Sequence, residues 1–155
     1  MGTRSTIALE FADGTVEQVY CHWDGYLDHN GAILVEHYSN PFKLRELIDL
    51  GDLSSLRPNI GEKHAFSQFS LRAEEVAGYK LLTEDMCTFY GRDRGEDGCE
   101  ARKYKNTDEY FDCSQQEEYD YILRTDGVWY VRCYTTNGVW LTMAEAKVTQ
   151  EECTA

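Results

Sequence analysis

Residues 118–143, EYDYILRTDGVWYVRCYTTNGVWLTM, hold the sharpest structural pattern of the chain. Asp126-Gly127 and Asn137-Gly138 interrupt an otherwise strand-like sequence. Asp-Gly and Asn-Gly favour tight hairpin turns, because these residues tolerate a positive φ. The pattern therefore predicts a three-stranded meander with strands at 118–124, 128–134 and 139–143.

A second hairpin is expected at the other end of the chain. Ile7, Leu9 and Phe11 alternate with more polar residues, Asp13-Gly14 supplies a turn, and the return strand ends at Asp24-Gly25. Weaker strands are expected at 88–90 and 101–105.

Helices are expected between the two sheet-forming ends. Asn30 is a suitable N-cap for a helix over 32–38. Asn40 and Pro41 are typical of the start of a second helix, which Gly51 can end. A short helix is expected at 107–113, capped by Thr107 or Asn106. The fold class is therefore α+β, with one antiparallel sheet and helices on one face.

The 155 residues suit a single domain, 1–155. Residues 52–86 lack a sustained period, and we expect a long irregular segment there, which could cover a site. Residues 148–155 are expected to form a frayed polar tail.

Charge is the dominant compositional feature. The chain carries 28 acidic and 15 basic side chains, a net charge of −13. This charge disfavours direct binding to nucleic acid or to anionic membranes and favours partners with a basic surface. There is no run of about 20 apolar residues and no export signal, so we expect a soluble protein that is not exported.

The six cysteines have no close pairing in sequence. In a protein that is not exported, we expect free thiols, several of them buried, in preference to disulfides. A zinc site is disfavoured because close ligand pairs are lacking.

The acidic charge is concentrated between residues 96 and 120, which hold 9 acidic and 3 basic side chains. This stretch is predicted to form an acidic binding surface, whose carboxylates could mimic duplex phosphates if many of them shared one face. The alternative is ordinary solvated surface. The candidate residues are Glu96, Asp97, Glu109, Asp112, Glu117, Glu118 and Asp120.

A second candidate site is a recess formed by two polar loops. The bend over 22–31 contributes His22, Asp24, Tyr26 and His29. With His37, these side chains could in principle hold a metal, but no tight ligand motif is present, so neither a metal nor a cofactor is assigned. The structural alternative is a turn at Asp24 and helix capping by His29.

The loop with Arg92, Asp93 and Arg94 completes the recess. Its guanidinium groups and neighbouring glycines could hold a phosphate or carboxylate. The favoured alternative is an internal clamp, in which the arginines pair with Asp24, Asp28 or the Glu96-Asp97 pair.

Aromatic residues give the meander two distinct faces. Trp129, Val131 and Cys133 are expected in the core, whereas the alternating Tyr130, Arg132 and Tyr134 would face away from it and could form a binding platform.

Several segments together resemble a family of small proteins carried by tailed bacteriophages. They are VYCHWDGY, NGAILVEHY, GDLSSL, YGRDRGE and EYDY before an Asp-Gly turn. The resemblance covers most of the chain. It implies expression in the cytoplasm of an infected bacterium, outside the set of virion components, and it implies no catalytic residues.

The leading hypothesis is a non-enzymatic phage accessory protein that binds and modulates a host factor through its acidic surface. A nucleic-acid-handling or defence protein would be such a factor. The alternative is a small phosphate- or nucleotide-binding protein, or an enzyme, that uses the recess, with His22 or Asp24 as acid or base. A third hypothesis is a homo-oligomer that associates through its aromatic face.

Overall fold

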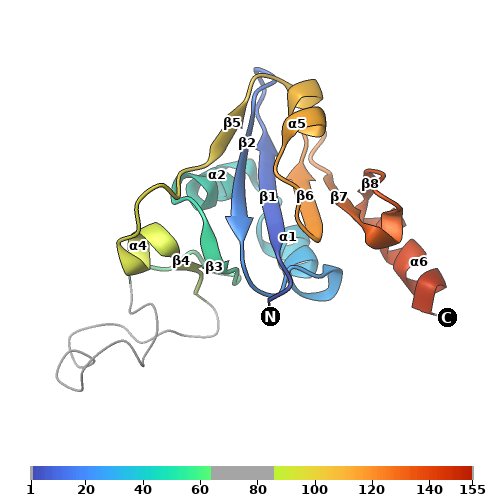
Figure 1. The fold of residues 1–155 in the computed structure, drawn as a ribbon, viewed down its shortest axis with the longest axis horizontal. Coiled ribbons are helices and arrows are strands. Elements are labelled where there is room, and N and C mark those ends of the chain that lie inside the picture. The colour runs from blue at the N-terminus through green and yellow to red at the C-terminus, as the bar shows by residue number, and fades with distance from the viewer. Residues whose placement is uncertain (1, 64–85, 155) are drawn as a thin grey trace.

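The computed structural model describes residues 2–63 and 86–154, with side chains described as far as residue 151. Helices and strands alternate irregularly along the chain (Figure 1). The strands are β1 (Ser5–Glu10), β2 (Val16–Cys21), β3 (Leu53–Ser55), β4 (Thr88–Phe89), β5 (Arg102–Tyr104), β6 (Tyr119–Leu123), β7 (Trp129–Cys133) and β8 (Leu141–Thr142). The helices are the π-helix η1 (Leu27–Gly31), α1 (Ala32–His37), α2 (Pro41–Asp49), α4 (Tyr90–Arg94), α5 (Thr107–Cys113), the 3-10 helix η3 (Tyr134–Thr136) and α6 (Met143–Thr154).

All eight strands join one sheet, in the order β4-β3-β2-β1-β6-β7-β8, with β5 paired to β2 outside this path. The predicted N-terminal hairpin is β1 and β2, and the predicted meander is β6, β7 and β8. Most pairings are antiparallel, and the α+β fold class is confirmed.

Two parallel pairings join the units that the sequence predicts separately. β1 lies parallel to β6, with Ser5 opposite Tyr119 and Leu9 opposite Leu123. β2 and β3 form a shorter parallel contact. β1 therefore lies in the middle of the sheet, which explains why five of its six residues are buried.

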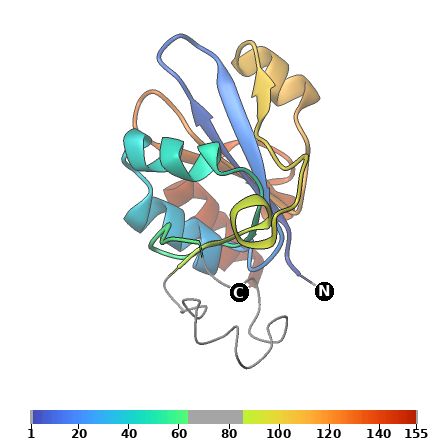
Figure 2. The same cartoon turned by 90° about the vertical axis from the view of Figure 1, so that its left-hand side faces the viewer.

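Helices cover the two faces of the sheet unequally. The larger core lies on the face that carries Ile7 and Val19, where it includes buried residues of α1, α2 and α6. The opposite face carries Ala8, Val16 and Ile122, against which Tyr110 of α5 packs. Figure 2 shows α1, α2 and α6 on one side of the sheet and α5 on the other.

Local capping signals account for two of the helices. The Asn40 side chain accepts a hydrogen bond from the Phe42 amide and caps α2, and Gly51 follows this helix with a φ of 86°. The Asn106 side chain accepts from the Glu109 amide and caps α5. Both N-caps are as predicted.

Two local predictions are wrong. Asn30 does not cap α1, because it lies within η1 and its buried amide donates to Ser5 Oγ and to the Trp23 carbonyl. The expected frayed tail after Lys147 is instead part of α6, which Met143 and Ala146 anchor in the core.

The expected irregular segment, 52–86, is described only in part. It contains the short strand β3 and a bridge between Asn59 and Met86, while 64–85 lie outside the described residues. Among the helices of the described residues, none has the length and apolar character needed to cross a membrane.

Candidate functional site

The predicted acidic surface is divided into two groups. Glu96 and Asp97 lie in the loop that follows α4, whereas Glu109 and Asp112 lie on α5 and Glu117 and Glu118 precede β6. Figures 1 and 2 both place α4 and α5 well apart, with β5 between them in the chain. The carboxylates therefore belong to two separated groups and do not form one continuous row along the chain.

Asp120 is not part of this surface, and its prediction as a surface residue is wrong. It lies on β6 with 1% of its surface exposed and accepts hydrogen bonds from Thr6 Oγ1 at 2.7 Å and from Arg132 at 3.3 Å. Burial raises the pKa of its carboxyl, opposed by these partners. Asp120 and Arg132 are directly opposite each other on β6 and β7, so they form a buried structural ion pair.

The other residues of the acidic surface differ in whether their carboxylates already accept hydrogen bonds within the protein. Glu109 accepts from the Lys105 amide and supports the start of α5. Glu117 accepts from the Gln115 side chain, and Glu118 from the Arg4 amide at 3.4 Å. Asp112 is exposed. Glu117 and Glu118 thus remain near solvent at the start of β6.

A hollow of about 310 Å³ lies beside these two glutamates. Its wall also includes Tyr134, whose side chain follows β7 and is 77% exposed, and its base includes the Asp120–Arg132 pair. We call it the acidic hollow. Because the charge of Arg132 is balanced by Asp120, the two glutamates determine the net charge of the hollow.

The predicted division of the meander into a buried face and an exposed face is confirmed only in part. Trp129, Val131 and Cys133 are buried as expected. Arg132 is buried as well, because its guanidinium stacks on Trp140 at 4.6 Å in the layer that covers the second face. Of the alternating residues, Tyr134 is the most exposed.

The bend between β2 and α1 brings together three of its four predicted residues. Asp24 adopts a φ of 58°, and the π-helix η1 follows it. The His29 ring lies 4.0 Å from the Asp24 carboxylate and 5.9 Å from the Tyr26 ring centroid. His29 also contacts Arg57 at 3.4 Å, a residue that the sequence analysis did not select because it lies in the irregular segment.

His22 belongs to a different local cluster. Its Nδ1 atom is 2.7 Å from the Tyr20 hydroxyl, and its ring meets Trp23 edge-on with centroids 4.8 Å apart. Within 2–63 and 86–151, no three His, Cys, Asp or Glu side chains gather in a way that could hold a metal ion.

Arg92 is an internal clamp. Its guanidinium makes five hydrogen bonds, two to Asp93 and three to the carbonyls of Ile60, Gly61 and Cys87. The group also stacks on Phe89 at 4.6 Å. A guanidinium has only five N–H donors, so Arg92 has none left for a phosphate.

The rest of this loop is also structural. The buried Asp93 carboxylate accepts from the Phe89 amide as well as from Arg92, and Arg94 pairs with Glu96 at 3.8 Å. The clamp interpretation is confirmed for Arg94 with one of its expected partners and for Arg92 with different ones. The prediction of Arg92 and Asp93 as ligand-binding residues is wrong, because both are engaged in joining α4 to neighbouring segments.

Among the residues that the structure describes, Cys21, Cys99, Cys113 and Cys133 form no disulfide. Comparisons with protein-family models, with curated proteins and with solved structures gave no match.

Proposed function

We propose that this chain is a non-enzymatic binding protein that attaches to a basic surface of a host protein through the acidic hollow. The observation that carries the proposal is the hollow itself, in which Glu117 and Glu118 lie beside the exposed ring of Tyr134. This combination suits a lysine or arginine side chain of a partner.

Two physical effects support a cationic occupant. The carboxylates of Glu117 and Glu118 attract a positive head group, and the face of an aromatic ring such as Tyr134 attracts the same charge through its quadrupole. The net charge of −13 adds a long-range field that accelerates encounter with basic proteins and slows encounter with acidic ones.

The acidic residues fall into two separate groups, and this restricts the kind of contact that a partner protein can make with them. A protein that imitates duplex DNA needs carboxylates spaced along one face, whereas here one group lies in the loop after α4 and the other on α5 and before β6. The geometry therefore favours insertion of one or two basic side chains of a partner over occupation of a whole DNA-binding groove.

The biological setting is part of the same proposal. The resemblance to small proteins of tailed bacteriophages supports action in the cytoplasm of an infected bacterium, as an accessory protein that modulates a host factor. Nucleic-acid-handling and defence proteins are the favoured class of target, because their working surfaces are basic. Inhibition would follow from blocking that surface.

The recess hypothesis receives less support. A nucleotide site there requires guanidinium donors, and those of Arg92 are taken by protein acceptors. His29 and Asp24 lie close enough to interact, but this pair alone does not make a catalytic site.

Affinity capture from bacterial lysate followed by binding measurements tests the proposal. Immobilised protein is expected to retain a basic host protein at low salt, and less of it at moderate salt. The double variant Glu117→Gln/Glu118→Gln should weaken binding of the purified partner about tenfold or more, mainly through the association rate and the salt dependence.

The matched control is Glu96→Gln/Asp97→Asn, which removes the same charge from the loop after α4. It should leave most of the affinity intact, whereas Tyr134→Ala should weaken binding. Equal losses in both double variants would show that only the overall charge matters. Affinity that is insensitive to salt and to all three changes would refute the acidic hollow as the contact site.

A further inference from the structure

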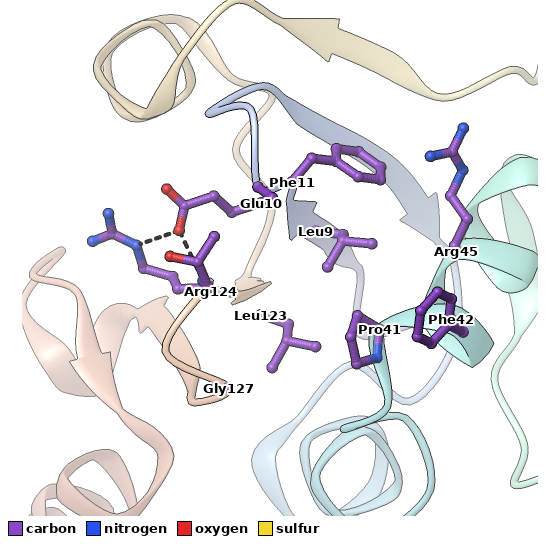
Figure 3. Close-up of a pocket in the computed structure, with 11 residues that line it drawn as sticks. Leu9, Glu10, Phe11, Pro41, Phe42, Arg45, Leu123, Arg124 and Gly127 are labelled. Atoms are coloured by element: carbon purple, nitrogen blue, oxygen red, sulfur yellow. Dashed lines mark hydrogen bonds and ion pairs between the residues drawn. The ribbon is translucent and has the colours of Figure 1, made fainter.

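A second cavity lies at the edge of the sheet where β1 and β6 end. It has a volume of about 350 Å³ and is lined by the last residues of β1 and β6, the turns that follow them and the first turn of α2 (Figure 3). We call it the switch-point pocket. Its size lies at the lower end of the range in which proteins bind small molecules.

The topology of the sheet explains why a pocket opens here. β1 and β6 are parallel neighbours, so both end at the same edge of the sheet. From there β1 connects to β2 on one side, whereas β6 connects to β7 on the other. Two turns that diverge from adjacent parallel strands leave a crevice between them, the position at which open α/β sheets bind ligands.

The interior of the pocket is apolar. Figure 3 shows the side chains of Leu9, Leu123 and Pro41 converging on the same space, with Phe11 beside them. Phe42 lies at the rim with 82% of its surface exposed. A phenylalanine this exposed is costly in water, and a ligand in the pocket would cover part of it.

Two arginines, Arg124 and Arg45, lie on opposite sides of this apolar interior. Arg124 donates through Nε to Glu10, and Arg45 donates through Nε to Asp49. Among the described residues, no acceptor is found for the terminal Nη atoms of either arginine. The carboxylate of Glu10 is meanwhile engaged by Arg124 and by the Thr125 amide.

The first turn of α2 adds to the positive potential. Pro41 is the first residue of this nine-residue helix, and Pro41 and Phe42 both line the pocket. The N-terminal end of a helix carries partial positive charge. Arg45 and Arg124 each neutralise a carboxylate, so an anion at the mouth is favoured by the unused Nη donors of Arg45 and by the helix end, and not by a net positive charge.

We propose that the switch-point pocket binds a small organic acid with an apolar body. The aliphatic or aromatic body lies against Leu9, Leu123 and Pro41, and the carboxylate pairs with the free Nη atoms of Arg45. The Arg45 guanidinium lies over the ring of Phe11, 4.8 Å from its centroid, and so stands beside the pocket. That of Arg124 lies over Phe111 and Tyr130 on the other face of the sheet. This inference is independent of the acidic hollow.

Octanoate is the test probe. The comparison ligands are 1-octanol and octylammonium, which have the same chain length but no negative charge. Octanoate is expected to shift the backbone amide resonances of the two turns and of α2, and to raise the melting temperature. Octanol should bind at least about tenfold more weakly, the loss expected for one charge-assisted hydrogen bond, and octylammonium should not bind.

Two variants locate the site. Ala12→Trp places a large side chain at the lining and should abolish octanoate binding, and Arg45→Gln should weaken octanoate while leaving octanol unchanged. Arg94→Gln, which removes a guanidinium at the end of α4, is the control. Circular dichroism verifies folding, and the arginine variant remains informative if Ala12→Trp does not fold.

Absence of octanoate binding, resonance shifts confined to other parts of the protein, or equal affinity for octanoate and octanol would each overturn the proposal.

Discussion

In this protein the role of an acidic residue depends on the side chains that surround it. Asp120 belongs to the most acidic stretch of the chain, but its carboxylate is buried between Thr6 and Arg132. Glu117 and Glu118, only a few residues earlier, remain near solvent and line the acidic hollow. The difference arises because Glu117 and Glu118 precede β6, whereas Asp120 lies on the strand opposite Arg132, on the face that α5 and Trp140 cover.

The buried ion pair gives a direct test of this assignment. Asp120→Ala leaves the Arg132 guanidinium without its counter-charge, so we expect the free energy of unfolding to fall by about 3 kcal/mol. Urea denaturation measures the change. Asp112→Ala, which removes an exposed carboxylate from α5, should alter stability by less than about 0.5 kcal/mol. Similar effects of the two substitutions would contradict a buried role for Asp120.

The cysteines provide a second test at the residue scale. Burial raises the pKa of Cys21 to about 12, whereas Cys113 is exposed. Thiolates, not thiols, react with iodoacetamide, so at pH 8 the native protein should be alkylated at Cys113 and protected at Cys21.

Mass spectrometry of digested protein measures this selectivity. In urea both cysteines should react, which serves as the control for reagent access. Rapid alkylation of Cys21 in the folded protein would be incompatible with its position in the core.

At the scale of elements, local signals set where most helices and strands begin and end. Asn40 and Pro41 define the start of α2, and Asn106 defines the start of α5. The polar tail after Lys147 shows the limit of such signals: α6 has little amphipathic pattern of its own, but it packs through Met143 and Ala146 and continues to Thr154. Tertiary contact at one end can sustain a helix of weak intrinsic pattern.

The cap of α2 is expected to make a measurable contribution. Asn40→Ala removes the side-chain acceptor for the Phe42 amide and should lower the free energy of unfolding by about 1 kcal/mol. Asn40→Gly should cost only a few tenths of a kcal/mol, since glycine is tolerated at N-caps. Chemical denaturation of the two variants distinguishes a capping effect from simple loss of the side chain, which would make them equally unstable.

At the scale of the whole molecule, the net charge of −13 acts on stability as well as on partner choice. Excess like charge favours expanded states through self-repulsion, and salt screens that repulsion. Because the described ion pairs at the surface are few and exposed pairs contribute little, the repulsion should dominate.

We therefore expect stability to rise with ionic strength. An increase from about 0.01 M to 0.1 M salt shortens the Debye length from about 30 Å to 10 Å, and the melting temperature should rise by about 3 °C. Scanning calorimetry measures the shift. Combined neutralisation of Glu96, Asp97 and Asp112 should reduce it, and a melting temperature that falls with salt would show that local ion pairs outweigh the repulsion.

The candidate sites were only partly predictable from the sequence. Acidic residues near 117–118 and an exposed tyrosine in the meander were identified, and the geometry places them together in the acidic hollow. The five hydrogen bonds of Arg92 could not be foreseen, because three of its acceptors are backbone carbonyls of remote or irregular segments. The switch-point pocket was missed entirely, since its walls come from three separate parts of the chain.

The sequence by itself determined the identity of most elements, because hydrophobic period, Asp-Gly turns and helix caps act over only a few residues. It also determined the strongly negative net charge of the chain. Only the tertiary structure decided that β1 pairs in parallel with β6, that α5 covers the second face and that Asp120 is buried. Each of these depends on contacts across long stretches of chain, such as the 114 residues between Thr6 and Asp120, and no local pattern records which distant partner a residue will meet.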